Sequence, residues 1–385
     1  MNIMMPYLNN KNDDPSHIPM TRPSITKKEI SYVNDAMKNG WGSNRNNYIE
    51  EFEKRFTHEI DIKYGVSTSS CTGALHLGLS ALGVGLGDEV IVPESTWIAS
   101  VSPIVHLGAK PIFVDILKDS WCIDPSLVEA AITPKTKAII CVHLYGNLCE
   151  LNQLIKISKK YNIPLIEDSA EAYGSYYFGK HAGTFGTFGV FSFHGSKTIS
   201  TGEGGMLVTN NEEIFKKVKI LNDHGLDRQN DKQYFPSKLG YKFKMTNIQA
   251  AMGLAQVERS QEILDKKIEI MKFYKNYFSD YNSISFNHEN IGNKNSYWLP
   301  TALFKNKKNF CISGLIRDFQ SQNIDARSFF WPLSSLSFFQ SNTNNKVSRD
   351  IPKRAINLSS FHDITESQLL KICSILEHKV QEIEA

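Results

Sequence analysis

The sequence predicts an α/β fold in which a large domain with a mainly parallel central sheet is followed by a smaller α+β domain. Three observations lead to this prediction. A chain of 385 residues is long enough for roughly two domains. Short apolar segments alternate with helix-like segments through the first half of the chain. Near Asn247 this alternation ends, and a long amphipathic pattern with shorter strands follows.

Four short segments rich in β-branched residues are expected to be buried strands. Strands that are apolar along most of their length and alternate with helices are typical of a parallel sheet covered on both faces. Ligands bind such sheets at the carboxyl ends of the strands, so polar residues there are the first candidates for chemistry. The expected strands are Asp88–Pro93, Lys110–Asp115, Lys137–His143 and Ile163–Asp168, and the expected helices are Thr72–Leu82, Ile98–His106, Pro125–Ile132 and Leu151–Tyr161.

The C-terminal part has a different pattern. Val257–Tyr281 carries apolar residues at helical spacing among many lysines and glutamates, which predicts one long amphipathic helix. Strand-like segments at Tyr297–Phe304 and Ile324–Phe330 follow, and then an exposed Asn-rich loop at Ser341–Asn345. A final helix is expected at about Glu366–Glu382.

We divide the chain into three parts. Residues 1–23 are polar and rich in Asn, Asp and Pro, which predicts a flexible segment without a secretory signal. Residues 24–255 form the large, ligand-binding domain and residues 256–385 the small domain. The six cysteines are scattered and form no C-x-x-C pair, so we expect reduced thiols, no metal site and a cytoplasmic location.

Composition argues against two classes of partner. Lys and Arg number 43 against 40 Asp and Glu, and a net charge of +3 gives no electrostatic case for nucleic acid or an anionic membrane surface. Mean hydropathy is −0.30, and no run of 18 apolar residues occurs, so no membrane span is expected.

The most informative segment is Phe191–Gly205. It places one lysine, Lys197, among Ser, Thr and Gly residues between two apolar strands, Gly189–Phe193 and Gly205–Thr209. Lysine is seldom buried without a function, and burial favours the neutral, nucleophilic amine. Such a lysine suits a Schiff base with an aldehyde cofactor. A surface lysine in a glycine-rich turn explains this segment alone about equally well.

Asp168 stands at the carboxyl end of an expected strand. A carboxylate there can pair with a cationic ring nitrogen, and at ~3 Å and an effective dielectric near 20 the pair gains roughly 5 kcal/mol before desolvation. Such a pair would keep the ring of pyridoxal phosphate protonated and a strong electron sink. Capping of a following helix is the alternative role, and the two are compatible.

Ser67–His76 opens a helix with small hydroxyl residues and a glycine. The free N–H groups of a helix N-terminus suit a phosphate, although simple capping explains the pattern as well. Gly83–Asp88 ends in Asp and precedes a strand, so it is not a dinucleotide fingerprint.

In the order phosphate helix, aspartate and lysine, these segments resemble fold-type I pyridoxal-phosphate enzymes, and more narrowly the DegT-type sugar-nucleotide aminotransferases. The likeness runs from about Pro19 to the C-terminus. Its motifs are Gly40–Ser43, Gly87–Pro93, Val142–Gly146, Ile166–Ala172, Ser192–Lys197, Gly202–Gly205 and Lys244–Asn247. Within the family, Ile166–Ala172 and Asp325–Pro332 are most similar to GDP-perosamine synthases.

The resemblance implies pyridoxal 5'-phosphate as the cofactor and a role for each matching residue. Lys197 would bind the cofactor and then shuttle protons, Asp168 would pair with its ring nitrogen, and Glu171 would reach its ring hydroxyl. Trp97 would stack on the cofactor ring, and Cys71, Thr72 and Ser192 would bind its phosphate. Asn247 would bind the cofactor phosphate of the neighbouring subunit in a homodimer. His143, His194 and Arg327 would shape the side of the site that binds the sugar nucleotide.

The sequence departs from the family in two places. Cys71 replaces a glycine of the usual Ser-Asn-Gly-Thr, which could narrow the approach of the phosphate. Phe193–Ser196 reads Phe-His-Gly-Ser where perosamine synthases often have Phe-Phe-Gly-Asn, which leaves the sugar and nucleotide open. Relatives that dehydrate C3 of a keto sugar replace the lysine with histidine, so Lys197 favours amino transfer.

The resemblance therefore predicts an enzyme that moves an amino group from L-glutamate to C4 of a 4-keto-6-deoxy sugar nucleotide, for a surface polysaccharide such as the O-antigen of lipopolysaccharide. GDP-4-keto-6-deoxymannose is the first substrate hypothesis. A dTDP-4-keto-6-deoxyglucose 4-aminotransferase and a 3-keto sugar aminotransferase are alternatives. A non-catalytic regulatory protein of the same fold is the rival from another class, and the presence of Lys197 and Asp168 argues against it.

Overall fold

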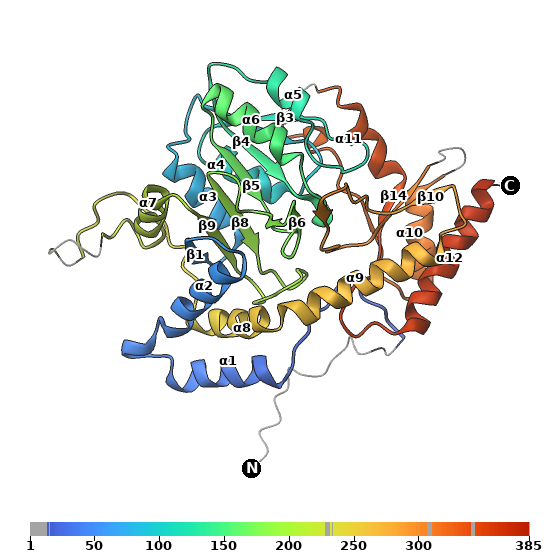
Figure 1. Ribbon diagram of the computed structural model, residues 1–385, viewed down its shortest axis with the longest axis horizontal. Coiled ribbons are helices and arrows are strands. Elements are labelled where there is room, and N and C mark those ends of the chain that lie inside the picture. Colours follow the sequence, from blue (N-terminus) through green and yellow to red (C-terminus); the bar gives the residue numbers. More distant parts are fainter. Residues whose placement is uncertain are drawn as a thin grey trace, which may run out of the picture.

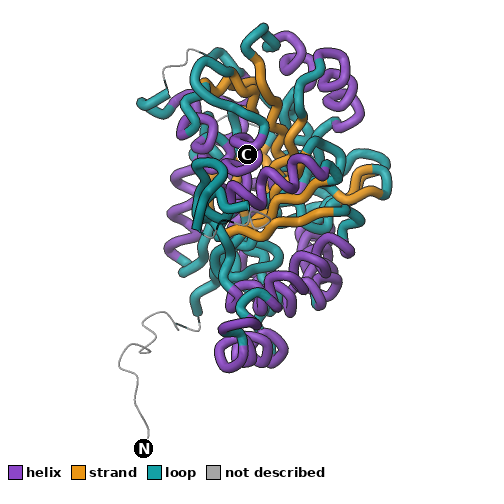
Figure 2. Tube along the Cα trace, turned by 90° about the vertical axis from the view of Figure 1, so that its left-hand side faces the viewer, coloured by secondary structure: helices purple, strands orange, loops and turns teal. Residues whose placement is uncertain are grey.

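The computed structural model of the chain describes residues 14, 16–227, 232, 234–305, 310–339 and 343–384. Two predictions fall partly outside them: residues 1–13 and 15 of the N-terminal segment, and residues 341 and 342 of the Asn-rich loop. A large part with a sheet at its centre continues into a smaller C-terminal part along helix α9 (Ser260–Tyr277) (Figure 1). A view from the side shows helices on both sides of the strands (Figure 2).

The central sheet is mainly parallel, as predicted. Its seven strands lie in the order β1-β9-β8-β5-β4-β2-β3, and in the described chain β9 alone runs against its neighbours. The strands are β1 (Tyr64–Thr68), β2 (Glu89–Pro93), β3 (Lys110–Val114), β4 (Thr136–Val142), β5 (Leu165–Asp168), β8 (Phe188–Ser192) and β9 (Gly205–Thr209).

Strand β4 shows why these segments form a covered sheet. Ala138, Ile139, Ile140 and Cys141 are consecutive and fully buried, so side chains on both faces of the strand are covered. Burying one aliphatic side chain of this size contributes about 1.5–3 kcal/mol. Apolar residues at both alternate positions therefore hold the sheet between its helical layers.

Several predicted helices are confirmed, namely α3 (Cys71–Ala81), α5 (Pro125–Ala130) and α6 (Leu151–Tyr161). The expected helix at Ile98–His106 is instead a 3₁₀ turn at Ile98–Ser100 followed by α4 (Ser102–His106). Pro103 explains the break, because proline fits the first turn of a new helix but not a helix interior. No helix among the described residues is long and apolar enough to cross a membrane.

The expected single helix at Val257–Tyr281 is in fact divided between α8 (Asn247–Glu258) and α9. Arg259 lies at the junction with φ −111° and ψ 7°, and its guanidinium is held 2.7 Å from Glu29 Oε1. The division lets α8 pack against α1 (Lys27–Asn39) and α2 (Asn47–Glu59), while α9 runs towards the C-terminal part. Helix α7 (Glu212–Asn222) follows β9.

The C-terminal part is built on a second, antiparallel sheet in the order β10-β12-β14-β13. Its own apolar cluster includes Ile270 and Tyr274 of α9, Phe304, and Leu376. This separate core supports the predicted division near residue 256, which stays a prediction. The strands of this sheet are β10 (Ile284–Ser285), β12 (Thr301–Phe304), β13 (Arg327–Ser328) and β14 (Ala355–Asn357). The helices of this part are α10 (Ile312–Ser321), α11 (Lys346–Asp350) and α12 (Glu366–Glu384). A separate small sheet joins β6 (Tyr176–Tyr177), β7 (Lys180–His181) and β11 (Asn293–Lys294).

The described end of the N-terminal segment differs from the flexible tail that its composition predicts. Ile18 and Met20 are buried, and Ile18 forms a parallel bridge with Ile324. The backbone oxygen of Met20 accepts a hydrogen bond from Ser360 N at 2.8 Å. Ile18 belongs to the apolar cluster of the C-terminal part and Met20 to that of the large part, so this segment is held by both.

Strand β9 passes directly against the N-terminus of α3 at Gly205. A Cβ at this position would collide with backbone atoms of Ser70 and Cys71. We expect Gly205→Ala to lower the free energy of unfolding by about 1–3 kcal/mol, because backbone cannot yield as a side chain can. Urea unfolding checks this expectation. The control is Gly85→Ala, because Leu107 O lies 4.0 Å from the added Cβ there. Equal stability of the two variants would contradict it.

Lys267 of α9 is a buried lysine whose amine is held by uncharged oxygen atoms. Its Nζ donates to Trp298 O at 3.2 Å, to Ser360 O at 2.5 Å and to Ser360 Oγ at 3.1 Å. Burial lowers the pKa of Lys267 to about 7. The folded state therefore gives up this proton near neutral pH, whereas the unfolded chain keeps it to about pH 10.

Since the unfolded state binds more protons between these two values, Lys267 makes the protein more stable as pH rises through this window, by at most about 1.4 kcal/mol per unit. We expect Lys267→Met to flatten the rise in unfolding free energy between pH 7.5 and 9.5. Urea unfolding across this range measures how steeply the unfolding free energy rises with pH. The variant also loses stability at every pH because two carbonyl groups lose their hydrogen-bond donor, but this constant loss does not change the slope. Parallel curves for the two proteins would refute the expectation.

Candidate active site

Lys197 lies in the loop between β8 and β9, where the sequence places it. The loop is closed by backbone hydrogen bonds from Gly195 N to Gly202 O at 2.7 Å and from Thr201 N to Phe193 O at 2.8 Å. The Lys197 side chain is 13% exposed, and its Nζ lies 3.2 Å from Glu171 Oε1. The lysine is therefore an enclosed amine paired with a carboxylate, and the alternative of a surface lysine is wrong.

Asp168 ends β5 and is buried. Its Oδ2 accepts from Ser100 Oγ at 2.7 Å, and its Oδ1 accepts from Ala170 N at 3.1 Å. Burial raises the pKa of Asp168, while Ser100, Ala170 N and the charge of Lys197 oppose that rise. Residues 169–175 form turns, so Asp168 does not cap a helix.

Glu171 is a second buried carboxylate beside Lys197. Its Oε2 accepts from Tyr145 N at 2.9 Å, while its Oε1 faces the lysine. Burial raises the pKa of Glu171, and the positive charge of Lys197 is the largest effect that lowers it. The site thus holds two carboxylates and one ammonium group, with a net negative charge suited to a cationic ring.

The N-terminus of α3 follows the carboxyl end of β1, on the same side of the sheet as Asp168. Ser70 accepts from Gly73 N and Ala74 N, which leaves the amides of Cys71 and Thr72 without an acceptor in the helix. Ser192 at the end of β8 pairs with Gly205, which abuts Cys71, so Ser192 lies near this helix terminus. Free amides, hydroxyl groups and a positive helix end fit a phosphate.

Cys71 belongs to the site electrostatically as well as by position. Burial is the main reason that the pKa of its thiol is raised, and the nearby charge of Asp168 adds to this effect while Lys197 opposes it. These charges link the helix terminus to the carboxylates and the lysine. A phosphate at one end and a cationic ring over Asp168 therefore fit the residues present.

Trp97 forms an aromatic edge of the site. It follows the carboxyl end of β2, it is 59% exposed, and its ring centroid lies 6.0 Å from that of Phe330. Phe330 in turn stacks on Tyr145 at 5.2 Å. Trp97 also precedes the turn that carries Ser100, so one short segment supplies an exposed ring and the donor to Asp168. Its stacking on a cofactor ring stays a prediction.

His143 is not available to a substrate, contrary to the sequence-based prediction. It is fully buried, its Nδ1 accepts from Cys149 N at 3.2 Å, and its Nε2 lies 3.1 Å from Glu167 Oε2. Glu167 also accepts from three backbone amides between residues 183 and 186. The pair therefore fixes the end of β5 from behind Asp168.

For three other predicted residues, the structure shows no side-chain contact with Lys197 among the described residues, although the backbone oxygen of His194 accepts from Lys197 N at 2.9 Å. His194 is exposed and contacts Ser196 Oγ at 2.9 Å, and Arg327 is exposed on the edge strand β13. Asn247 accepts from Tyr48 N at 3.0 Å and so holds the first turn of α2. Sugar-nucleotide contacts by His194 and Arg327, and a phosphate contact by Asn247 in a neighbouring subunit, stay predictions.

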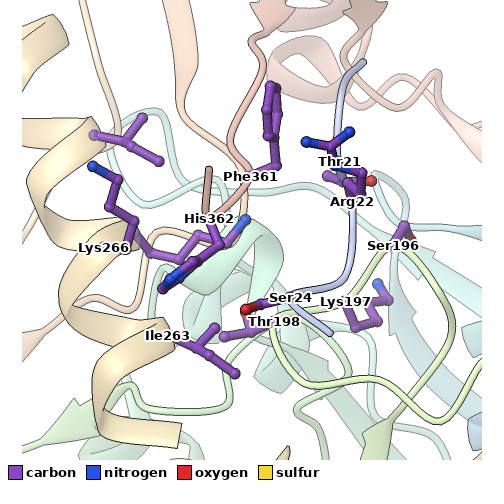
Figure 3. A pocket seen from close by; sticks show the side chains of 12 residues that line it. Thr21, Arg22, Ser24, Ser196, Lys197, Thr198, Ile263, Lys266, Phe361 and His362 are labelled. Atoms are coloured by element: carbon purple, nitrogen blue, oxygen red, sulfur yellow. The ribbon is translucent and has the colours of Figure 1, made fainter. Parts of the chain in front are cut away.

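A small pocket borders Lys197 (Figure 3). Ser196 and Lys197 lie on one side of it, and Lys266, His362 and Ile263 lie on the other. The pocket therefore lies between the lysine loop and the C-terminal part. Among the residues that the structure describes, no group of three or more His, Cys, Asp or Glu side chains could hold a metal ion.

Sequence reasoning missed Ser100, Tyr145 and Trp298. Ser100 follows the carboxyl end of β2, so the rule that directs attention to strand ends could have found it. Tyr145 contributes its backbone N–H, and Trp298 enters from a distant loop to lie over Lys197, so neither carries a local signal.

A lysine in the loop between β8 and β9, an aspartate at the end of β5 and a helix N-terminus suited to a phosphate are the arrangement of a pyridoxal-phosphate enzyme of fold type I. The chain belongs to the DegT/DnrJ/EryC1/StrS aminotransferase family, whose profile matches residues 23–377. It is a pyridoxal-phosphate-dependent aminotransferase.

Known relatives cover nearly the whole chain. A GDP-perosamine synthase of Escherichia coli O157:H7 is 39% identical over 93% of this chain and 97% of the relative. One from Vibrio cholerae is 36% identical over 94% and 98%. The pyridoxal-phosphate form of the putative sugar aminotransferase Spr1654 of Streptococcus pneumoniae is 30% identical, with a TM-score of 0.88 over 95% of this chain and 99% of that chain.

The Ser100 hydroxyl is one of two groups that hold the Asp168 carboxylate. We expect Ser100→Ala to weaken binding of pyridoxal 5'-phosphate by about tenfold, because a hydrogen bond to a charged group contributes about 1.5 kcal/mol or more. Absorbance titration of the cofactor-free protein measures this affinity. Ser102→Ala is the matched control, since the Ser102 hydroxyl donates to Ile98 O at 3.0 Å and not to the site. Indistinguishable affinities would contradict the expected role.

Proposed function

We propose that this protein is a homodimeric, cytoplasmic enzyme that transfers an amino group from L-glutamate to C4 of GDP-4-keto-6-deoxymannose, for a surface polysaccharide such as O-antigen. The observation that carries the chemistry is the enclosed Lys197 amine, 3.2 Å from Glu171 Oε1 at the carboxyl edge of the sheet. The near full-length likeness to GDP-perosamine synthases supports the choice of sugar nucleotide.

The side chains around Lys197 suit amino transfer. When bound, pyridoxal phosphate supplies an aldehyde that carries the amino group and a ring that accepts electrons. Asp168 would hold a proton on the ring nitrogen, because an adjacent carboxylate favours the charged form of a base. The amides of Cys71 and Thr72, with the Ser192 hydroxyl, would fix the phosphate.

Lys197 would move protons between carbon and nitrogen atoms of the substrate as a general acid and base. Glu171 holds its amine in place, and the enclosure of the pair keeps bulk water from competing for the proton. Trp97 would give one face of the ring a flat aromatic surface. Each of these steps uses a group whose position the fold fixes before a substrate arrives.

An exposed apolar surface supports the homodimer. Ile30, Met37 and Trp41 are 54%, 51% and 61% exposed on or directly after α1. Asn247 Nδ2 lies 3.4 Å from Gly40 O, so the residue proposed to reach a neighbouring subunit lies beside this surface. Contiguous exposed apolar side chains commonly mark protein interfaces.

Two half-reactions test the proposed function. The protein is first converted with L-glutamate to the form in which the cofactor carries the amino group. GDP- and dTDP-4-keto-6-deoxy sugars are then added separately, and the absorbance of the aldehyde form is followed. We expect recovery with the GDP sugar, and no glutamate half-reaction in Lys197→Ala.

Lys217→Ala, which changes an exposed lysine of α7, is the control and should react like the unmodified protein. Recovery with the dTDP sugar alone would replace the nucleotide in this proposal. Recovery with neither sugar, after a competent glutamate step, would overturn the substrate class. Failure of the glutamate step in the unmodified protein would favour a non-catalytic role.

A further inference from the structure

We propose that Trp298 is a positioning residue for Lys197, holding both the amine and the loop that carries it; this inference rests on the proposed role of Lys197. Trp298 lies 101 positions further along the chain, in the segment between β11 and β12. It is 6% exposed, so its ring is enclosed with the lysine.

The indole ring lies directly over the Lys197 amine. Nζ is 3.6 Å from the ring centroid and 3.2 Å from Glu171 Oε1. An ammonium group within about 6 Å of a tryptophan face is attracted by the ring electrons, and enclosure from water strengthens the attraction. The amine is thus held by an aromatic face as well as by a carboxylate.

The same side chain also holds the lysine loop. The indole Nε1–H donates to the backbone oxygen of Ser196 at 2.7 Å, in the peptide unit directly before Lys197. Trp298 therefore contacts Lys197 both at the tip of its side chain and at its backbone. A ring that only filled space would need neither the donor nor the cation over its face.

Trp298 is itself fixed from the C-terminal part. Its backbone oxygen accepts from the buried Lys267 Nζ of α9 at 3.2 Å, and Lys267 also donates to Ser360. The ring of Tyr145 lies 6.0 Å from the indole at an interplanar angle of 30°. Contacts from α9 and from the turn after β4 thus fix the position of the Trp298 ring, and the ring in turn positions Lys197.

Removal of the ring face should favour the neutral amine over the ammonium form. The other groups that act on Lys197 remain in place: Glu171 on the turn after β5, Asp168 at the end of β5 and Cys71 on α3. The charged or titratable groups that share its pocket also remain, namely Arg22, Lys266, Lys267 and His362. A change in the protonation of Lys197 in a Trp298 variant would therefore report on the ring.

The test measures acetylation of Lys197 by acetic anhydride in the cofactor-free full chain, between pH 6 and 11, by mass spectrometry of the peptide that contains it. We expect Trp298→Leu to move the midpoint of labelling about one pH unit lower. Trp298→Phe keeps an aromatic face without the N–H donor, so its labelling midpoint should move by no more than half as much as that of Trp298→Leu. Lys160, whose Nζ lies 4.9 Å from the Tyr161 ring, is an internal control with an unchanged profile.

Each outcome decides the inference. An unchanged midpoint in Trp298→Leu would overturn it, and so would an equal shift in both variants, because the aromatic face would then contribute nothing. A purely steric opening would raise the labelling rate by the same factor at every pH. If Trp298→Leu does not fold, as judged by circular dichroism, a smaller shift of the same sign in Trp298→Phe supports the proposal, and no shift there overturns it.

The labelling experiment contains no cofactor or substrate, so its result is independent of the amino-transfer assay. If the proposed sugar nucleotide is wrong, the expected labelling midpoints do not change. If the labelling midpoint is unchanged in Trp298→Leu, the expected result of the amino-transfer assay does not change.

Discussion

The site depends on one electrostatic constraint, the burial of two carboxylates beside a single lysine. Asp168 and Glu171 are each less than 10% exposed, and burial raises the pKa of both. Buried charges persist only where partners compensate for lost hydration. Here Ser100, the backbone N–H groups of Ala170 and Tyr145, and the Lys197 ammonium provide that compensation.

This constraint extends through the surrounding fold. The carboxyl end of β5 carries Asp168 towards the ligand edge, and the residue before it, Glu167, points into the interior. His143 and three backbone amides satisfy Glu167. Because side chains alternate along a strand, β5 places the Asp168 carboxylate in the site and the Glu167 carboxylate in the interior beneath it. His143 pairs with Glu167, so it stabilises the end of β5 although its place in the sequence resembles that of a site residue.

The two parts of the chain meet at the lysine. The large sheet contributes the loop of Lys197, and the segment after β11 contributes Trp298, which α9 holds through Lys267. The pocket beside Lys197 is lined by residues of both parts, including Ser196, Ile263 and Phe361. A movement of the C-terminal part would therefore displace the Trp298 ring first and the Lys197 amine through it.

The sequence by itself indicated the alternation of buried strands with helices and pointed to Lys197, Asp168 and the N-terminus of α3 as candidates for the site, because each lies in a local pattern of apolar strand followed by polar residues. Only the tertiary structure decided that α8 and α9 separate at Arg259, that His143 is enclosed, and that Ser100 and Trp298 reach the site. These outcomes depend on contacts between distant segments, such as Glu29 with Arg259, which are 230 positions apart. The local pattern of residues contains no information about such contacts.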